Sequence, residues 1–392
     1  MTYKQAIVKS LIERMLMYPF VLSGKIYAYF FPLKTKHGVV IFCPSADIGG
    51  SVRVTIDLCL CFAHKSPLVI FSKRPKNNKF LHLFNIEGIR MIDLHRYIDY
   101  KFYHFINFFY RGVITSWLNN VQASVVIGSE SLFFYKVLPH IKKEIRRVDI
   151  CHLNSWFNYT QAFIKYLDAR IFSTEKLKRD AQTLYNLNKL PPHFHSRLYF
   201  IDNKIDLPKY VLNNNDILSV VFVGRGALQK RIHIVSNIAK KIEQMKANIH
   251  FSFVGDVDKM INPSDLPFCT FYGNIKDRYN LEQIYQQSDV LLLTSSYEGL
   301  PLVVMEMMAY GKVIVSTAVD AIPDYITDGE NGFLIENNTD ENKIIDDAIS
   351  VLLKLASNKL LLQQMGAKSR IFAEKHFNED TFCQNYQKIL FD

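Results

Sequence analysis

The sequence predicts an α/β protein with two doubly wound, Rossmann-like parallel-sheet domains that face a central cleft. Three observations point to this fold class. Short apolar runs rich in β-branched residues alternate with helix-length segments along the chain, as parallel sheets with crossover helices require. The runs are apolar almost throughout, which is typical of strands buried on both faces. A length of 392 residues favours two domains at roughly 150 residues each.

The predicted strands fall into two groups on either side of a segment rich in Pro and Asn. The first group is 39–43, 67–71, 124–128, 147–153, 169–173 and 197–202, and the second is 219–224, 250–255, 269–273, 290–294 and 312–317. Segment 202–216 carries turn-forming residues between the groups. We therefore expect one domain at 1–205 and another at 206–375. Residues 376–392 have helical apolar periodicity and either finish the second domain or cross back to pack on the first.

The charge differs between the two halves. Residues 1–200 hold 28 Lys and Arg against 12 Asp and Glu, whereas residues 201–392 hold 19 against 25. A basic half favours an anionic partner, which includes phosphates, nucleic acid and lipid headgroups. Because no known nucleic-acid-binding module is recognisable, we expect no nucleic-acid partner.

Two segments of the basic half indicate a membrane surface. Residues 1–31 begin like a signal peptide, but no small-x-small cleavage site follows. Pro19, Gly24 and Lys25 interrupt the apolar run, so it makes a poor membrane span and an amphipathic helix is expected. Residues 96–117 interleave aromatic and basic side chains, which suits either a membrane interface or a buried helix. Together they predict a cytoplasmic protein, peripheral on the inner face of the cytoplasmic membrane and bound to anionic lipid.

The cysteines carry no metal or disulfide pattern. No two of the six form a C-x-x-C pair, and most lie in strand-like runs. We interpret them as buried thiols in a reducing compartment. They are Cys43, Cys59, Cys61, Cys151, Cys269 and Cys383.

The strongest motif is SSYEGLPLVVMEMMAYGKVIVST at 295–317. A predicted strand ends there and a helix is expected to begin near Gly299, because Pro301 suits a first helical turn. Exposed backbone N–H groups at such a start can take a phosphate. Glu298 and Glu306 are eight residues apart, just over two helical turns, so both carboxylates can border one crevice. Carboxylates accept hydrogen bonds from hydroxyls, which suits a sugar.

Two further turns follow predicted strands. In VVFVGRGALQKR at 220–231, Gly224 is followed by Arg225 and Lys230, and two cations at the carboxyl end of a strand can neutralise a diphosphate. A solvated basic loop is the alternative. In the first half, Gly49 and Gly50 precede a predicted helix, where glycines let an anion approach the backbone. A structural tight turn is the alternative there.

These motifs together resemble the retaining nucleotide-sugar glycosyltransferases of the GT-B fold, family 4 (glycosyl transferases group 1). The resemblance covers about 198–375 well. Its motifs are Gly224 with a Lys six residues later, FVGD, YGNI, the E-x7-E of Glu298 and Glu306, and DYITDGENGFLI. In the first half it rests on Gly49-Gly50 with Arg53 and on RVDICHLNSW, which contains His152.

The resemblance implies roles for these residues. Arg225 and Lys230 would hold the diphosphate of a UDP- or GDP-linked sugar. Glu298 would contact the sugar and Glu306 the ribose. The donor-binding set would also include Gly49, Gly50, Gly224, Gly299 and Leu300, with His152 beside the sugar. The set of expected catalytic residues is Glu298, His152, Lys230 and Arg225.

Two positions depart from the family pattern. Arg231 stands where a Gly commonly follows the Lys, and it either adds a phosphate contact or closes the loop differently. NKID at 203–206 replaces the usual NGID, which indicates an altered hinge turn.

The chemistry implied is transfer with retention to a lipid-linked or surface-polysaccharide acceptor, without a cofactor. Fixed cations and a helix start would stabilise the leaving diphosphate without a metal. Two other functions stay open: a sugar-nucleotide epimerase of the same architecture, and a catalytically silent sugar-nucleotide-binding partner at a membrane.

Two residue pairs imitate metal sites. Asp256 and Asp258 form a D-x-D, as in metal-dependent glycosyltransferases of another fold, but they follow FVG, where the family has a glycine turn. His193 and His195 lack nearby cysteines or carboxylates in the sequence. We therefore expect no metal site.

Overall fold

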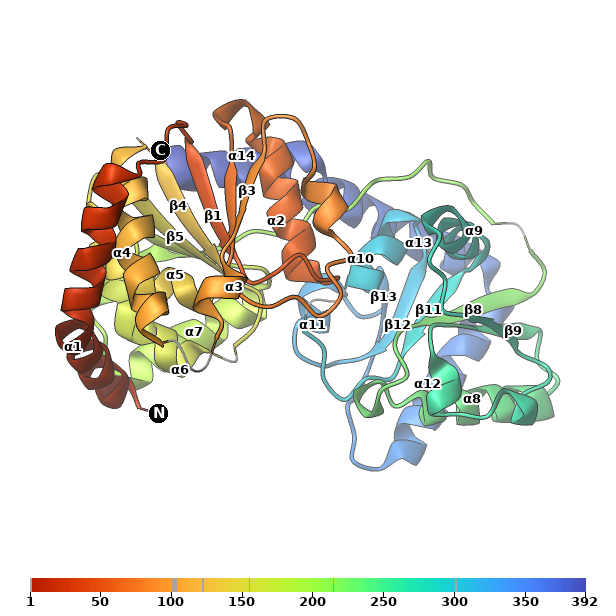
Figure 1. Cartoon of the computed structure of the whole chain (residues 1–392). Coiled ribbons are helices and arrows are strands. Elements are labelled where there is room, and N and C mark those ends of the chain that lie inside the picture. The colour runs from red at the N-terminus through yellow and green to blue at the C-terminus, as the bar shows by residue number, and fades with distance from the viewer. Residues whose placement is uncertain (1, 101–103, 122, 155, 214, 300–301) are drawn as a thin grey trace. The chain divides into compact units, whose positions relative to one another are not determined.

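The computed structural model describes residues 2–392 except 101–103, 122, 155, 214 and 300–301. This part of the chain divides into two compact units (Figure 1). Unit 1 comprises residues 1–203 and 382–392, and unit 2 comprises residues 204–381. The chain therefore leaves unit 1 once, builds unit 2, and returns to unit 1 with its last helix.

Unit 1 is built on a sheet whose described strands all pair in parallel. In sheet order they are β3 (Arg90–Asp93), β2 (Leu68–Phe71), β1 (Val39–Cys43), β4 (Val125–Ser129), β5 (Arg146–Cys151), β6 (Ala169–Phe172) and β7 (Leu198–Phe200). Most of these strands are buried along their whole length. The order reverses between β1 and β4, which makes that point the topological switch of the sheet.

Helices cover both faces of this sheet, as continuous apolar strands require. The helices of unit 1 are α1 (Tyr3–Phe30), α2 (Gly50–Cys61), α3 (His95–Ile98), α4 (His104–Asn120), α5 (Leu132–Val137), α6 (Phe157–Thr160), α7 (Glu175–Leu187) and α14 (Glu379–Phe391). Side chains of α4, α5 and α7 share one core with Val40 and Phe42. Side chains of α2 and α14 share the opposite core with Val39 and Ile41.

Unit 2 repeats the arrangement with a second parallel sheet. Its described strands are β10 (Thr270–Gly273), β9 (Ile249–Val254), β8 (Leu218–Val223), β11 (Val290–Leu293), β12 (Val313–Thr317) and β13 (Gly332–Ile335), in sheet order. Its helices are α8 (Ile232–Gln244), α9 (Arg278–Gln287), α10 (Leu302–Ala309), α11 (Ile322–Tyr325), α12 (Glu341–Ser357) and α13 (Lys359–His376). The order reverses between β8 and β11. The predicted class is confirmed: two doubly wound parallel sheets, with a C-terminal helix that crosses back.

The N-terminal helix departs from the amphipathic pattern that the sequence led us to expect. Its buried residues are small, namely Ala6, Val21, Gly24 and Ala28, and its large apolar side chains point outward. A Cβ on Gly24 would lie 2.0 Å from the Phe109 carbonyl oxygen, and one on Gly112 would lie 1.9 Å from that of Val21. Helices α1 and α4 thus cross with their backbones in contact, which only glycine permits there.

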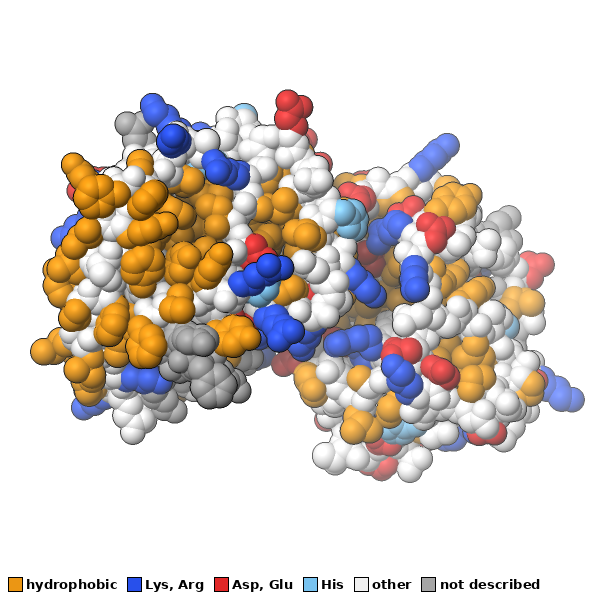
Figure 2. All heavy atoms as spheres, in the orientation of Figure 1, with side chains coloured by type: hydrophobic (Ala, Val, Ile, Leu, Met, Phe, Trp, Pro, Cys, Tyr) orange, Lys and Arg blue, Asp and Glu red, His pale blue; other side chains and the backbone are white. Residues whose placement is uncertain are grey.

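The close crossing leaves an apolar surface, which we call the α1/α4 face (Figure 2). Its exposed members include Leu11, Met15, Leu16, Phe20, Tyr29 and Phe30 of α1 and Phe105 of α4. Phe20 packs against Phe105 and Phe108, and Tyr27 packs against Phe109. Among the described helices, none is both long and apolar enough to cross a membrane.

The cysteine prediction is wrong for one pair. Cys61 at the end of α2 and Cys383 in α14 form a disulfide across 322 residues of sequence. Sequence separation hid this pair, because the return of the chain to unit 1 is what brings the two residues together. Cys43, Cys59 and Cys151 are buried free thiols, and Cys269 is half-buried.

Candidate functional site

The two topological switch points gather most of the residues that the sequence singled out. Ligands of open α/β sheets bind outside the carboxyl ends of strands at such points. In unit 2 these ends carry Gly224 after β8 and Thr294 after β11. In unit 1 they carry Pro44 after β1 and Glu130 after β4.

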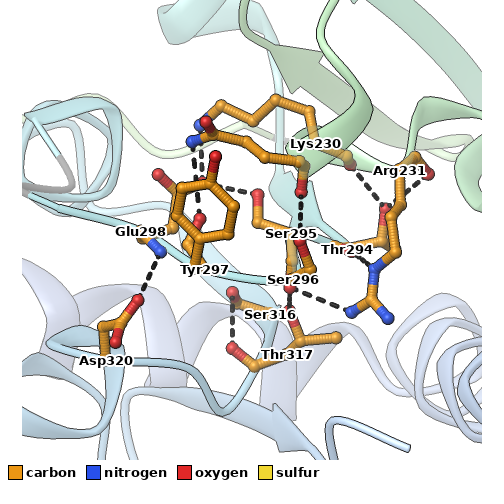
Figure 3. Close-up of polar contacts among 11 residues, drawn as sticks. Lys230, Arg231, Thr294, Ser295, Ser296, Tyr297, Glu298, Ser316, Thr317 and Asp320 are labelled. Atoms are coloured by element: carbon orange, nitrogen blue, oxygen red, sulfur yellow. Dashed lines mark hydrogen bonds and ion pairs between the residues drawn. The ribbon is translucent and has the colours of Figure 1, made fainter. Parts of the chain in front are cut away.

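In unit 2, Lys230 and Glu298 are in direct contact although 68 residues separate them (Figure 3). The Lys230 Nζ lies 2.5 Å from Glu298 Oε1. The Ser295 hydroxyl donates to the same carboxylate oxygen at 2.5 Å. Glu298 is only 8% exposed. An ion pair this buried needs further hydrogen bonds to offset its desolvation, and Ser295 supplies one.

The segment around Glu298 is fixed through its backbone. The Glu298 N–H donates to the Asp320 carboxylate at 2.7 Å, and Asp320 itself has a φ of 45°. A left-handed conformation at a residue other than glycine is uncommon and marks an over-determined position. The Ser296 N–H donates to the Gln229 carbonyl at 2.8 Å. This hydrogen bond therefore joins the loop after β8 to the loop after β11.

Arg231 closes this loop. It has a φ of 45°, the left-handed region that glycine tolerates best. Its guanidinium donates to the Thr294 and Ser295 carbonyl oxygens and to Asn337. The departure from the family pattern at this position thus follows the second interpretation: the guanidinium ties the loop to the end of β11 (Figure 3).

The turns after β8 and β9 lie against each other and need glycine at Gly226 and Gly255. A Cβ on Gly255, which has a φ of 118°, would lie 1.8 Å from the Gly224 carbonyl oxygen. The Gly226 N–H donates to the Asp256 carboxylate at 2.9 Å, and Lys259 pairs with the other oxygen of that carboxylate. Asp256 therefore shapes the glycine turn. His195, from the other motif that imitated a metal site, packs its ring against Tyr185.

Glu306 already has two partners inside unit 2. Arg278 donates to one carboxylate oxygen at 2.7 Å, and the Tyr285 hydroxyl donates to the other at 2.9 Å. The carboxylate is partly exposed, at 18%. Burial and then the Glu306 charge raise the pKa of Tyr285 well above its ordinary range, so its hydroxyl stays a donor. No motif in the sequence indicated these two partners.

The remaining donor residues of the prediction are less constrained. Arg225 is exposed directly after Gly224, and Gly299 is exposed ahead of α10. Leu300 lies outside the described residues, as does Pro301, and α10 begins at Leu302. The arrangement of Gly299 and Leu300 around a phosphate therefore stays a prediction.

In unit 1, His152 is buried at 5% exposure. Neither of its ring nitrogens has a hydrogen-bond partner among the described residues. Burial lowers the pKa of His152 to about 4, so the ring is neutral at pH 7. A buried polar group without a partner is costly, and both ring nitrogens of His152 remain available to a ligand.

Glu130 positions the segment that holds His152, and sequence analysis missed it. Glu130 has a φ of 54°, and its carboxylate accepts from the His152 and Leu153 N–H groups at 2.6 and 3.0 Å. Burial raises the pKa of Glu130 to about 7 against those two hydrogen bonds. The one signal available was an acidic residue two positions after the predicted strand 124–128.

Gly49 and Gly50 lie at the start of α2, with Gly49 in the N-cap position. A Cβ on Gly49 would meet nothing within 4 Å. Packing inside unit 1 does not require glycine there, so the open space is available to a ligand. For Gly49, this geometry does not support the alternative of a structural tight turn.

The fold and these contacts define the class of protein. Residues 203–370 match the model of the family glycosyl transferases group 1. This part of the chain is similar to that family, and the two sheets form the GT-B fold. Alr3699/HepE from Anabaena, solved with UDP, has a TM-score of 0.70 at 14% identity over 90% of this chain and 99% of that one.

Two curated relatives are similar over part of their length. The N-acetyl-alpha-D-glucosaminyl L-malate synthase of Bacillus anthracis is 26% identical over 231 residues, 55% of each protein. The poly(ribitol-phosphate) alpha-N-acetylglucosaminyltransferase of Staphylococcus aureus is 24% identical over 70% of this chain and 56% of its own. The chain thus spans about half the length of the curated relatives it matches.

Proposed function

We propose that this chain is a retaining glycosyltransferase that uses a nucleotide diphosphate sugar. The observation that carries the proposal is the buried Lys230–Glu298 pair at the switch point of unit 2. A fixed cation next to a carboxylate can serve both parts of such a donor, because the diphosphate needs a positive group and the sugar hydroxyls need an acceptor. The family match and the UDP bound to the Anabaena structure support it.

In this mechanism unit 2 stabilises the leaving group. Breaking the sugar–phosphate bond builds negative charge on the diphosphate and positive charge on the sugar ring. Lys230 and Arg225 neutralise the diphosphate, and the preorganised loops hold Lys230 in place before substrate arrives. Fixed charges then do the work of a divalent cation. The acceptor oxygen bonds to the anomeric carbon from the face that the diphosphate leaves, which gives retention, and the departing phosphate takes the acceptor's proton.

Three other side chains have proposed roles. Glu298 binds sugar hydroxyls with the carboxylate oxygen that does not pair with Lys230. Glu306 accepts from the ribose hydroxyls, with its orientation set by Arg278 and Tyr285. His152, neutral and without a partner among the described residues, takes part in sugar recognition on the unit 1 side, where Gly49 and Gly50 offer an anion site.

A thermal-shift panel of UDP- and GDP-linked sugars tests the donor assignment, because a bound ligand raises the unfolding temperature. We expect one nucleotide sugar to stabilise the protein and Lys230→Ala to remove that effect. Glu298→Gln should keep nucleoside diphosphate binding and lose turnover. If no nucleotide sugar shifts the transition, the proposal is wrong; turnover without any acceptor would favour an epimerase.

We propose that the acceptor is a lipid-linked or cell-envelope glycan, reached at the inner face of the cytoplasmic membrane. The α1/α4 face supports this, because Met15 and Phe30 are 78% and 68% exposed. Contiguous exposed apolar side chains mark interaction surfaces. Basic residues on α1, such as Lys4, Lys9 and Arg14, favour anionic lipid.

Vesicle sedimentation tests this surface. The full-length protein should bind anionic phosphatidylglycerol vesicles, less at 0.15 M salt than at 0.01 M, since charges are screened over about 8 Å at 0.15 M. Met15→Glu and Phe30→Glu should each reduce binding. Leu187→Glu, at a 75% exposed position on α7, is the matched control. Equal binding of all three variants would exclude the α1/α4 face.

A further inference from the structure

A cavity of about 330 Å³ lies at the switch point of unit 1. Its wall includes Pro44 after β1, Ser72 and Lys73 after β2, and Glu130 and Ser131 after β4. A volume near 300 Å³ is at the lower end of small-molecule sites. Neither the family match, which covers residues 203–370, nor the residues predicted from sequence account for this cavity.

The wall of the cavity contains three cations: Lys73, Arg111 of α4 and Lys136 of α5. Arg111 is buried at 7% exposure, and the Lys136 side chain is 20% exposed. The Arg111 guanidinium lies 4.6 Å from the centre of the Phe108 ring, and Lys136 lies over Tyr159. These contacts hold the side chains of Arg111 and Lys136.

Arg111 and Lys136 share one carboxylate. Glu13 of α1 pairs with Arg111 at 2.6 Å and with Lys136 at 2.5 Å. Burial lowers the pKa of Lys136 and of Arg111, although Glu13 offsets part of the effect. Arg111 and Lys136 carry two positive charges and Glu13 carries one negative charge. A net charge of +1 therefore remains where water solvates it poorly. A second anion would therefore be bound favourably.

The rest of the wall suits a sugar. Glu130 and Asp99 offer carboxylate oxygens to hydroxyl groups, and Asp99 is held by the Arg74 N–H at 2.8 Å. Trp156, 49% exposed, and Phe108 supply flat apolar surfaces against which the C–H face of a sugar ring can pack. Cations and hydroxyl acceptors around one cavity point to a ligand that combines a phosphate and a sugar.

We propose that this cavity binds the phosphate-bearing end of the acceptor, a sugar phosphate that is either free or lipid-linked. Lys73, Arg111 and Lys136 hold the phosphate, and Glu130 and Asp99 hold the hydroxyls. This inference rests on the proposed glycosyltransferase function and adds the chemical class of its acceptor. Because Glu13 belongs to α1, the helix of the proposed membrane face also sets the charge of the cavity.

Two variants of opposite expected sign test the proposal by titration calorimetry with glucose 1-phosphate. Lys73→Gln, on an exposed turn, should weaken binding about tenfold, as loss of one charged contact does. Glu13→Gln should strengthen binding several-fold, because it removes the internal competitor of the phosphate. Lys76→Gln, exposed in the same loop and absent from the cavity wall, is the matched control.

The donor site also attracts phosphate, so each titration is repeated in a Lys230→Ala background. Binding that survives Lys230→Ala and falls with Lys73→Gln belongs to the cavity. The donor proposal fails separately, if nucleotide sugars do not bind. Dodecyl phosphate in neutral detergent micelles tests the lipid-linked form, and sodium phosphate the free ion. The cavity proposal is overturned if Lys73→Gln and Glu13→Gln bind every phosphate probe like wild type, or if glucose binds as well as glucose 1-phosphate.

Discussion

The two switch points of this molecule are built in different ways. In unit 2 the side chains at the strand ends already satisfy one another: Lys230 pairs with Glu298, and Arg231 binds the end of β11. In unit 1 two ring nitrogens of His152 have no partner among the described residues, and two cations share Glu13. Unit 2 is thus preorganised before it binds a ligand, whereas unit 1 has binding capacity that its own residues leave unmet. This difference fits the proposed roles, in which unit 2 binds the nucleotide sugar and unit 1 binds the acceptor.

The largest expected effect comes from removing the lysine of the preorganised site in unit 2. Lys230→Ala should lower turnover at least about a hundredfold, the loss typical of one preorganised charge-stabilising group. The fold should persist, since Lys230 lies on a short turn before α8. Steady-state kinetics on the purified variant measure this effect, and Lys241→Ala, an exposed lysine paired with Asp346, is the control. Near-normal turnover of Lys230→Ala would remove the leaving-group assignment.

The second prediction uses the titration of unit 1. Glu130 has a pKa of about 7 when folded, above its ordinary value of 4.5, so its stabilising contribution is present below pH 4.5 and is lost as pH rises through 7. In the Glu130→Gln variant this loss of stability with rising pH is absent, because the amide does not ionise. Its stability relative to wild type should rise between pH 4.5 and 7.5, by at most about 3 kcal/mol.

Urea denaturation across this range measures the difference. His152 contributes in the opposite sense, since its pKa of about 4 means stability is lost as pH falls from 6.5 through 4. A difference between Glu130→Gln and wild type that stays constant with pH would contradict the raised pKa.

The third prediction separates Glu306 from its neighbours. Glu306→Gln should weaken nucleoside diphosphate binding about tenfold, the value of one or two hydrogen bonds to a charged group, while kcat changes less. Glu282→Gln is the control. Glu282 also pairs with Arg278, with 2.7 Å between Arg278 Nε and Glu282 Oε1, but it does not belong to the proposed site. Calorimetry that finds the two variants equal would withdraw the ribose contact.

For the last prediction, removal of divalent cations, we expect no change in turnover. If fixed charges hold the diphosphate, turnover should be unchanged in excess EDTA, and Asp258→Asn should cost little. If Asp256 and Asp258 held a metal, EDTA should abolish turnover and Mn²⁺ should restore it, because the cation would then stabilise the leaving group. Asp256→Asn is a poorer probe, since Asp256 also holds the Gly226 N–H.

The sequence predicted the fold class because its strands are continuous apolar runs. It missed β3 and β13 for physical reasons: β3 is an edge strand with exposed ends, and β13 begins with a glycine. In the site, the spacing of Glu298 and Glu306 was visible, but their partners were not. Asp320, Arg278 and Tyr285 are distant in sequence and have no motif, so only the folded chain brings them to the glutamates. The same holds for Cys61 and Cys383.

Because the chain returns to unit 1 with α14, unit 1 can be completed only after unit 2 has been synthesised. Phe382, Tyr386 and Leu390 of α14 are almost fully buried in the core that α2 and β1 also form. A ribosome delivers these residues only after all of unit 2 has been made. The unit that begins first therefore cannot complete its core until the second has emerged, and during that interval Val39, Ile41 and their neighbours lack part of their cover. Nascent chains stalled before residue 382 should accordingly be held by chaperones through unit 1.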